Sequence, residues 1–473
     1  MRTVASGALC LGIRHQRSPV YSASSDRAAL RSGRMVLGSF AMNRPLIVIY
    51  AAILLDAVGI GLIFPILPAL LAEVTHAGNV APYIGIMTAL YAAVQFVFAP
   101  LLGSLSDRIG RRPVLVISLF GAAINYVFLA FAGSLTLLLL GRAIAGLTSA
   151  NVSVATAYIT DITEADGRAR RFGLMNAMFG IGFIVGPVLG GTLGDHLLRL
   201  PFIAAAVLNG VNLLMALVFL PESREPVATA APDGAEVRSR SFFSRFRLVR
   251  KVCNLSGGSA HEKLDLAALN PLKPFGWLFE VKSLWPLIAI FFLLSATGEA
   301  YGTSWALWGG DVFGWNGMMI GLSLGAFGVC QTLAQAFLPG PAVALLGERA
   351  AILTGLTSAM AALVIMAFAT EGWIVFAIMP LFALGGLGVP ALQAMATRQV
   401  SESQQGQFQG VLASALSLAS IVAPLGFSSF YAVVRGTWPG AVWLSVVAVY
   451  AVAAVMVGRR GVRTTTTYQA KVL

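Results

Sequence analysis

Long apolar stretches recur along this sequence from residue 46 onward, and each covers about 20 to 25 residues, enough for a helix to cross a hydrocarbon core of roughly 30 Å. The composition agrees, because 57% of the 473 residues are apolar and only 11% are charged. A soluble domain of this size needs no such excess of apolar residues. The sequence therefore predicts an all-α membrane protein.

The apolar stretches form two sets of six, so we expect twelve transmembrane helices in two six-helix halves. The first set comprises residues 46–71, 82–104, 113–133, 135–160, 172–195 and 201–220, and the second comprises 284–308, 317–340, 350–369, 372–394, 407–430 and 438–458. The corresponding domains are an N-terminal half at 42–220, a cytoplasmic linker at 221–283, a C-terminal half at 284–458 and a cytoplasmic tail at 459–473.

The first 41 residues belong to none of these spans. They are rich in arginine and serine, and Asp26 is their one acidic residue. We expect residues 1–41 to be either a disordered leader or an over-extended start, since Met42 directly precedes the first span. An organellar transit peptide is the alternative, because such peptides share this composition.

The formal net charge of +12 does not indicate nucleic acid binding, because the positive residues lie in short connections, without interleaved aromatics or a basic helix face. They gather in the connections after the even-numbered spans, whereas the alternate connections contain only Arg199 and Arg435. By the positive-inside rule, both termini are expected in the cytoplasm.

Neither a metal site nor a disulfide framework is indicated. Cys10, Cys253 and Cys330 are few and widely spaced, and none of the four histidines lies in the middle of a span. We therefore expect no metal and no cofactor.

An internal repeat relates the two sets of spans. The segment GPAVALLGER begins at Gly340, 237 positions after GSLSDRIGRR begins at Gly103, and Pro424 follows Pro187 at the same interval. Two parallel repeats with a site between them near the membrane midplane are a transporter architecture.

The connection after the second span has the composition of a tight, charged turn. It contains, in order, Gly103, Asp107, Arg108, Gly110, Arg111 and Arg112. Glycines permit a tight turn, Asp107 can cap the next helix or pair across the interface between the halves, and the arginines can face anionic lipid. We expect this loop to act as a cytoplasmic gate. The alternative is a turn whose arginines only set the topology.

The fifth span combines small residues with a proline. Its pattern comprises Gly173, Gly182, Gly186, Pro187, Gly190 and Gly191. Small residues let helices approach closely, and a proline inside a span bends the helix at a defined place. The pattern predicts either a bend used in a conformational change or close packing alone.

These two motifs resemble those of a known family. The loop at 103–112 is similar to the signature loop of the major facilitator superfamily, and the pattern from Gly173 to Gly191 matches the motif of its antiporters. The chain from Arg44 to about Gly458 further resembles tetracycline/proton antiporters of the multidrug efflux branch. That likeness lies in LDAVGIGLIFP at 55–65, GRAIAG at 141–146, PALQAM at 390–395 and QGQFQG at 405–410. The resemblance implies proton-coupled drug efflux.

Three charged residues within the predicted spans are the candidates for proton coupling, since a charge near the centre of a membrane helix costs at least about 2.5 kcal/mol. Asp56 lies about 18 Å from the inner face and Arg142 roughly 10 Å below the outer face, so their depths nearly coincide. We expect them to interact, as a structural ion pair or a proton-linked one. Glu299, about 25 Å from Lys282, is expected in the outer third. It either lines the cavity and carries a proton or sits at a wet helix end.

The sequence departs from its relatives at three places. The resemblance implies an aspartate in span 3, a histidine in span 8 and an aspartate in span 9, where this chain has Asn125, Gln331 and Ala359. The usual coupling route and the binding of a metal-chelated tetracycline are therefore open questions. Uncharged polar residues either line a substrate cavity or tie helices together. The predicted cavity set is Gln95, Asn125, Asn151, Gln331, Gln335 and Gln393.

The expected function is proton-coupled efflux of a small amphipathic compound by alternating access, with a tetracycline-like drug as the first candidate. The alternatives are a facilitator, an exporter of another metabolite or drug, and a non-transporting membrane sensor that acts through its basic linker. The spans show no cluster of nucleophile and base that would indicate an enzyme. The expected partners are a small-molecule substrate, protons and the lipid bilayer, and we expect a monomer in the bacterial inner membrane.

Overall fold

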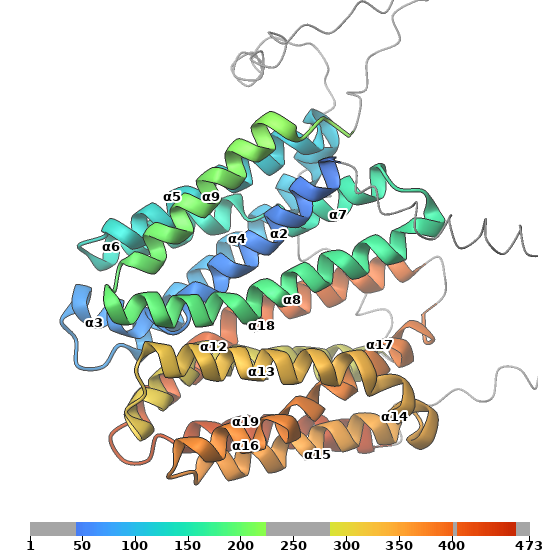
Figure 1. Cartoon of the computed structure of the whole chain (residues 1–473). Coiled ribbons are helices and arrows are strands. Elements are labelled where there is room, and N and C mark those ends of the chain that lie inside the picture. The colour runs from blue at the N-terminus through green and yellow to red at the C-terminus, as the bar shows by residue number, and fades with distance from the viewer. Residues whose placement is uncertain (1–43, 224–283, 401–403, 460–473) are drawn as a thin grey trace, which may run out of the picture. The chain divides into compact units, whose positions relative to one another are not determined.

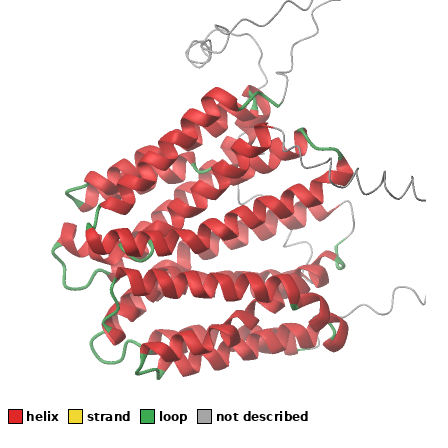
Figure 2. Cartoon of the chain, viewed as in Figure 1, coloured by secondary structure: helices red, strands yellow, loops and turns green. Residues whose placement is uncertain are grey.

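A computed structural model describes residues 44–223, 284–400 and 404–459. The predicted leader, most of the predicted linker and the tail lie outside these ranges. Within them every regular element is a helix (Figure 2). Twelve helical segments of the described residues are long and apolar enough to cross a membrane. The prediction of an all-α membrane protein with twelve spans is confirmed.

The helices follow the predicted order along the chain. The N-terminal half contains α2 (Arg44–Ile63), α3 (Leu67–Thr75), α4 (Ala81–Ile109), α5 (Arg111–Phe131), α6 (Leu135–Thr148), α7 (Asn151–Asp161), α8 (Ala165–His196) and α9 (Leu200–Phe219). The C-terminal half contains α12 (Trp285–Phe313), α13 (Gly317–Phe337), α14 (Pro339–Leu346), α15 (Glu348–Ala367), α16 (Gly372–Ala383), the 3₁₀ helix η3 (Leu384–Leu387), α17 (Gly388–Thr397), α18 (Gln405–Val434) and α19 (Ala441–Gly458).

The first span is shorter than predicted. It was expected to continue to residue 71, but α2 ends at Ile63 and α3 begins at Leu67. Pro65 lies in the connecting turn, and a proline has no backbone N–H with which to continue the helical hydrogen bonds. A separate short helix, α3, therefore follows the span.

Two spans are broken in the middle, at equivalent positions of the two halves. The fourth span is interrupted between α6 and α7 at Ser149 and Ala150, and the tenth passes from α16 through η3 into α17. Gly386 of η3 lies 237 positions after Ser149, the interval of the sequence repeat. Irregular backbone inside a membrane is tolerated where it is buried in protein or lines a cavity. The breaks therefore mark a place for a binding site.

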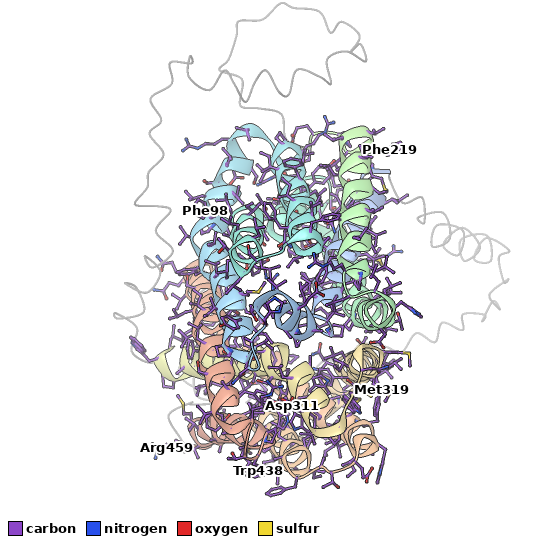
Figure 3. The ribbon with its side chains drawn as sticks, turned by 90° about the vertical axis from the view of Figure 1, so that its left-hand side faces the viewer. Phe98, Phe219, Asp311, Met319, Trp438 and Arg459 are labelled. Carbon is purple, nitrogen blue, oxygen red and sulfur yellow. The ribbon has the colours of Figure 1, made fainter. Side chains whose placement is uncertain are left out.

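Two pairs of helices join the halves. The helix α8 packs along α13, and α4 packs along α18 (Figure 1). Figure 3 looks along the spans, with the N-terminal half above the C-terminal half. We call the end of the bundle at which α9 ends and α12 begins the linker end, and the opposite end the far end. Each half is filled by its own apolar side chains, while many other apolar residues point outward, where lipid would surround them.

Candidate functional site

A cavity of about 840 Å³ lies between the two halves. Its walls come from α2, α4, α5, α6 and α8 on one side and mainly from α12, α13, η3, α18 and α19 on the other. Most of the lining is apolar or aromatic, with a few polar groups, as is usual for small-molecule sites. The three charged residues singled out in the spans, Asp56, Arg142 and Glu299, all line this cavity.

Asp56 is held at the wall of the N-terminal half by the first residue of α7. Its Oδ1 accepts a hydrogen bond of 3.2 Å from Nδ2 of Asn151. The break before α7 makes this contact possible and also exposes Ser149, whose Oγ lies 2.8 Å from both the Tyr91 hydroxyl and Nε2 of Gln95. The broken span thus organises a polar wall around Asp56.

Arg142 lies in the same cavity but makes a different contact. Its guanidinium lies 5.4 Å from the centroid of the Tyr91 ring, a cation–π arrangement. Its Nε is buried without a hydrogen-bond partner. Among the described residues no ion pair joins Arg142 to Asp56, so the expected direct interaction is absent from this conformation. The physical reason is that the carboxylate bonds to the Asn151 amide and the guanidinium stacks on the ring.

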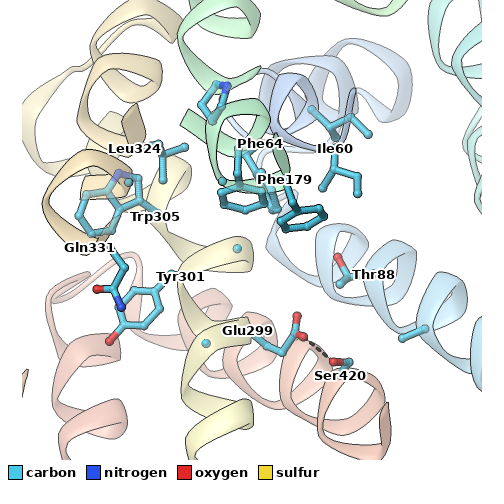
Figure 4. A pocket seen from close by; sticks show the side chains of 18 of the residues that line it. Ile60, Phe64, Thr88, Phe179, Glu299, Tyr301, Trp305, Leu324, Gln331 and Ser420 are labelled. Carbon is cyan, nitrogen blue, oxygen red and sulfur yellow. Dashed lines mark hydrogen bonds between the residues drawn. The ribbon is translucent and has the colours of Figure 1, made fainter. Parts of the chain in front are cut away.

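Glu299 lies at the midpoint of α12, because the helix runs from Trp285 to Phe313. The expectation that it lies in the outer third was wrong, since the helix extends five residues further toward the far end than the predicted span did. Its Oε1 accepts a hydrogen bond of 2.6 Å from Oγ of Ser420 on α18 (Figure 4). Glu299 therefore faces the cavity and does not sit at a wet helix end.

The structure brings five of the six predicted cavity amides together. Those that line the cavity are Gln95, Asn125, Asn151, Gln331 and Gln335. Gln393 does not, because it lies on α17 beyond the break in the tenth span, with an exposed side chain. Oδ1 of Asn125 is buried without a hydrogen-bond partner, so it is available to a ligand. Ala359, the third departure from the relatives, is fully buried in α15 and does not line the cavity.

The predicted gate loop forms a network at the linker end. The guanidinium of Arg111, which is 8% exposed, lies 2.7 Å from Asp107 and 3.2 Å from Asp161. Gly110 has φ of +104°, a backbone conformation that favours glycine. The carboxylate that caps α5 is that of Glu222, which accepts hydrogen bonds from the backbone N–H groups of Arg111 (2.8 Å) and Arg112 (3.2 Å).

Two other residues of this loop are placed less tightly. The guanidinium of Arg112 donates a 2.5 Å hydrogen bond to the Leu217 carbonyl at the end of α9. At Gly103 an added Cβ would meet nothing within 4 Å. Arg108 is the basic residue of the last turn of α4. The printed contacts of the loop all lie within the N-terminal half.

The glycine pattern of the fifth span packs α8 against both halves. A Cβ on Gly182 would lie 2.6 Å from the Leu54 carbonyl oxygen, and one on Gly186 would lie 2.6 Å from the Val58 carbonyl oxygen. Gly190 contacts Leu62 in the same way. These three glycines therefore allow α2, which carries Asp56, to lie directly against α8.

The rest of the pattern faces the other half. Gly191 contacts the backbone of Gly317, and the carbonyl of Pro187 contacts Gly321, both on α13. At Gly173, nearer the linker end, an added Cβ would meet nothing within 4 Å. The close approach of α8 to α13 therefore belongs to the far end and the middle of the two helices.

Hydrogen bonds join the halves at the far end. The carboxylate of Asp195, on α8, accepts from the backbone N–H groups of Gly317 (2.8 Å) and Met318 (3.0 Å), the first residues of α13. Nδ2 of Asn79 donates to the Ala432 carbonyl at 3.2 Å. An anionic group at a helix N-terminus is stabilised by the helix dipole and the free N–H groups.

Arg435 adds a further link between the halves. It pairs with Asp311 of its own half through two 2.7 Å bonds and donates a 2.8 Å bond to the Gly78 carbonyl of the other half. The hydrogen bonds to Asp311 raise the pKa of the Arg435 guanidinium above its ordinary value. This link therefore stays charged at any ordinary pH.

Sequence reasoning missed two features of the site. One is Ser420, an ordinary serine on an apolar helix, which no local pattern marks as the partner of Glu299. The other is the pair of broken spans. Gly385 and Gly386 in the tenth span, set against the Gly146 to Ser149 stretch of the fourth, are interruptions at matching places of the repeat, and that signal could have identified the breaks.

Comparisons with known proteins agree with this architecture. The model of the Major Facilitator Superfamily matches residues 49–326. The tetracycline resistance protein of class C from Escherichia coli is 44% identical over 410 residues, which cover 87% of this chain and 95% of that protein. The class G tetracycline resistance protein from Vibrio anguillarum is 43% identical over 390 residues, which cover 82% and 91% respectively.

Solved structures share the fold at low sequence identity. The nucleoside transporter NupG superposes with a TM-score of 0.68 at 15% identity, over 88% of this chain and 98% of that one. The human organic anion transporter TETRAN superposes with a TM-score of 0.58 at 22% identity, over 88% and 99%. The twelve spans, the repeated halves with a cavity between them, and these matches lead to one conclusion. This chain is an integral, multi-pass membrane protein that belongs to the Major Facilitator Superfamily.

Proposed function

We propose that this protein is a proton-driven efflux antiporter of the bacterial inner membrane and that a tetracycline-like drug is its first candidate substrate. One observation carries the proposal: a cavity between the halves contains a carboxylate from each half, Asp56 and Glu299. Relatives that are more than 40% identical over most of the chain are named for tetracycline resistance, which supports the choice of substrate.

The linker end is proposed to face the cytoplasm. The arginines of the predicted gate loop lie at that end, and positive residues favour the cytoplasmic side. Cross-half hydrogen bonds of Asp195 and Arg435 hold the far end shut. The far end is then the outer gate, and the conformation described here is the one that receives substrate from the cytoplasm. We propose that the protein works as a monomer, since the cavity is built from one chain.

Transport follows from the two carboxylates. Substrate enters from the linker end and displaces a proton from a cavity carboxylate, because a buried acid group is either protonated or paired with a positive charge. Rotation of the halves about the cavity closes the linker end and breaks the far-end bonds. A proton from outside then neutralises the carboxylate and releases the substrate, which couples export to the proton gradient.

The test is uptake of tetracycline into inverted membrane vesicles that contain the protein, with and without an imposed proton gradient. We expect accumulation that depends on the gradient. Asp56→Asn should abolish most of it, whereas Glu371→Gln, the loss of an exposed carboxylate outside the cavity, should leave it intact. Equal flux with and without the gradient would instead indicate a facilitator. Absence of flux for tetracycline and for a panel of other amphipathic drugs would contradict the proposal.

A second candidate is an exporter of another amphipathic compound with no activity on tetracycline. The observation that favours it is the lining of the cavity. Asn125 and Gln331 stand where the resemblance implies titratable groups, and Ala359 is buried away from the cavity. The same vesicle experiment separates the two candidates, because gradient-driven accumulation of other drugs alone would keep the mechanism and change the substrate.

A further inference from the structure

Glu299 is a cavity carboxylate without a positive partner among the described residues. Oε1 accepts one hydrogen bond, at 2.6 Å from the Ser420 hydroxyl, and no ion pair involves either oxygen. The residue is at the midpoint of α12, in the middle of the membrane span. A carboxylate in such a place carries a large desolvation cost when it is charged, so it is stable only with a bound proton or a bound cation.

The charges of the cavity are unevenly distributed. Its described titratable or charged groups other than Glu299 are Asp56, Arg142, Tyr91, Tyr126, Tyr301 and Tyr450. Arg142 is the one cation among them, and it belongs to the N-terminal wall, where it lies over Tyr91. It shares that wall with Asp56. The wall of the C-terminal half therefore presents a carboxylate and no compensating positive charge.

Aromatic rings stand on both sides of Glu299. On its own wall, Tyr301 lies 5.0 Å from Phe382, and Phe382 lies 4.9 Å from Phe327, measured between ring centroids. On the opposite wall, Phe179 stacks on Phe183 at 6.1 Å. Figure 4 shows the Glu299 carboxylate between these groups, with Trp305 beside Tyr301. Ring faces attract cations, and flat rings stack on flat ligands.

We propose that Glu299, together with the aromatic rings around it, is the binding site for the positive charge of an aromatic organic cation that is carried without a metal ion. The inference rests on the proposed function, since it names the substrate class of the same cavity. Glu299 pairs with the cationic group, Ser420 orients the carboxylate, and the rings hold the apolar body of the ligand. A proton and the organic cation occupy Glu299 in turn, so each displaces the other.

The test is direct binding of tetraphenylphosphonium, a permanent aromatic cation, to the purified full-length protein in detergent. Triphenylphosphine oxide serves as the neutral aromatic probe. Glu299→Gln should weaken binding of the cation about tenfold or more and leave the neutral probe unchanged. Binding of the cation to the unmodified protein should weaken as the pH falls, and Glu299→Gln should remove that dependence. Glu371→Gln, the same chemical change outside the cavity, should behave as the unmodified protein.

Unchanged cation binding in Glu299→Gln would overturn the inference, and retained binding of the neutral probe shows that the variant is folded. A chelator should not alter cation binding. Tetracycline binding that requires Mg²⁺ and is insensitive to Glu299→Gln would place the positive charge on a metal chelate, which also overturns it. The proposed function fails separately, through absence of gradient-driven flux in vesicles, whatever the binding result.

Discussion

The two ends of the bundle use polar contacts in opposite ways, within each half at the linker end and between the halves at the far end. At the linker end Arg111 pairs with Asp161 at 3.2 Å, and Glu348 pairs with Arg398 at 3.0 Å. Positions 348 and 398 each lie 237 residues after 111 and 161. The two halves therefore contain the same ion pair at the same place with its charges reversed.

At the far end the printed contacts of Asp195, Asn79 and Arg435 reach the backbone of the other half. Each bonds an N–H or carbonyl group near the end of a helix, which remains satisfied by water when the halves part. The reversed ion pairs need not break during a rocking motion, because each is internal to one half. The comparison teaches that the linker-end pairs stabilise the halves as rigid bodies, whereas the far-end bonds set the balance between conformations.

The largest expected effect comes from reversing one charge of the linker-end pair. Arg111→Glu places a carboxylate, almost fully buried, beside Asp107 and Asp161, and the loss of a buried partner costs about 3 to 5 kcal/mol. We expect little folded protein in the membrane. Adding Asp161→Arg should recover much of it, because the C-terminal half shows that the fold accepts the reversed arrangement. The measurement is thermal unfolding of detergent-purified protein.

The control for this comparison is Arg398→Ala. The Arg398 side chain is 71% exposed, so its ion pair with Glu348 contributes at most about 1 kcal/mol. It should lower the unfolding temperature only slightly. A double variant no more stable than Arg111→Glu alone would show that the two pairs are not interchangeable, and the comparison between the halves would then fail.

Much of the fold was predictable from the sequence, because span length, arginine placement and the repeat are local or periodic signals. The cavity position of Asp56 and Glu299 was predictable for the same reason, since a charge in a span needs a polar surrounding. The partners were not. Asn151 reaches Asp56 across 95 residues of sequence, and Ser420 reaches Glu299 across 121. Such pairings depend on how helices rotate against one another, which apolar periodicity leaves undetermined.

The second largest effect is expected at Gly191. A Cβ there would collide with the backbone of Gly317, so Gly191→Ala should prevent α8 and α13 from closing at the far end. The measurement is the distance between spin labels on cysteines replacing Gly133 and Gly436, exposed positions on opposite halves, in a protein whose native cysteines are changed to serine. We expect a longer distance. Gly173→Ala is the matched control, because no atom lies within 4 Å of its added Cβ, and an unchanged far-end distance is expected.

A moderate effect is expected at Asp195. Asp195→Asn keeps the shape of the cap on α13 but removes its charge, which weakens the far-end contact by about 0.5 to 1 kcal/mol. The same label pair should show a several-fold larger population with the far end open. Asp195→Ala should increase it further, since both hydrogen bonds are lost. Equal distance distributions in all three proteins would mean that the cap does not help to hold the outer gate.

The smallest effect is expected at Asn79, where the repeat supplies its own control. Asn79 and Asn316 occupy equivalent positions and cap α4 and α13 through the backbone N–H groups of Ala81 and Met319. Asn79 alone of the two has a printed bond to the other half, to the Ala432 carbonyl. Alanine at either position should cost about 1 kcal/mol of stability through the lost cap. We expect Asn79→Ala also to lengthen the far-end label distance slightly, and Asn316→Ala to do so less. If the two variants shift the distance equally, the cross-half bond contributes nothing beyond the cap, and Asn79 does not belong among the bonds that control opening.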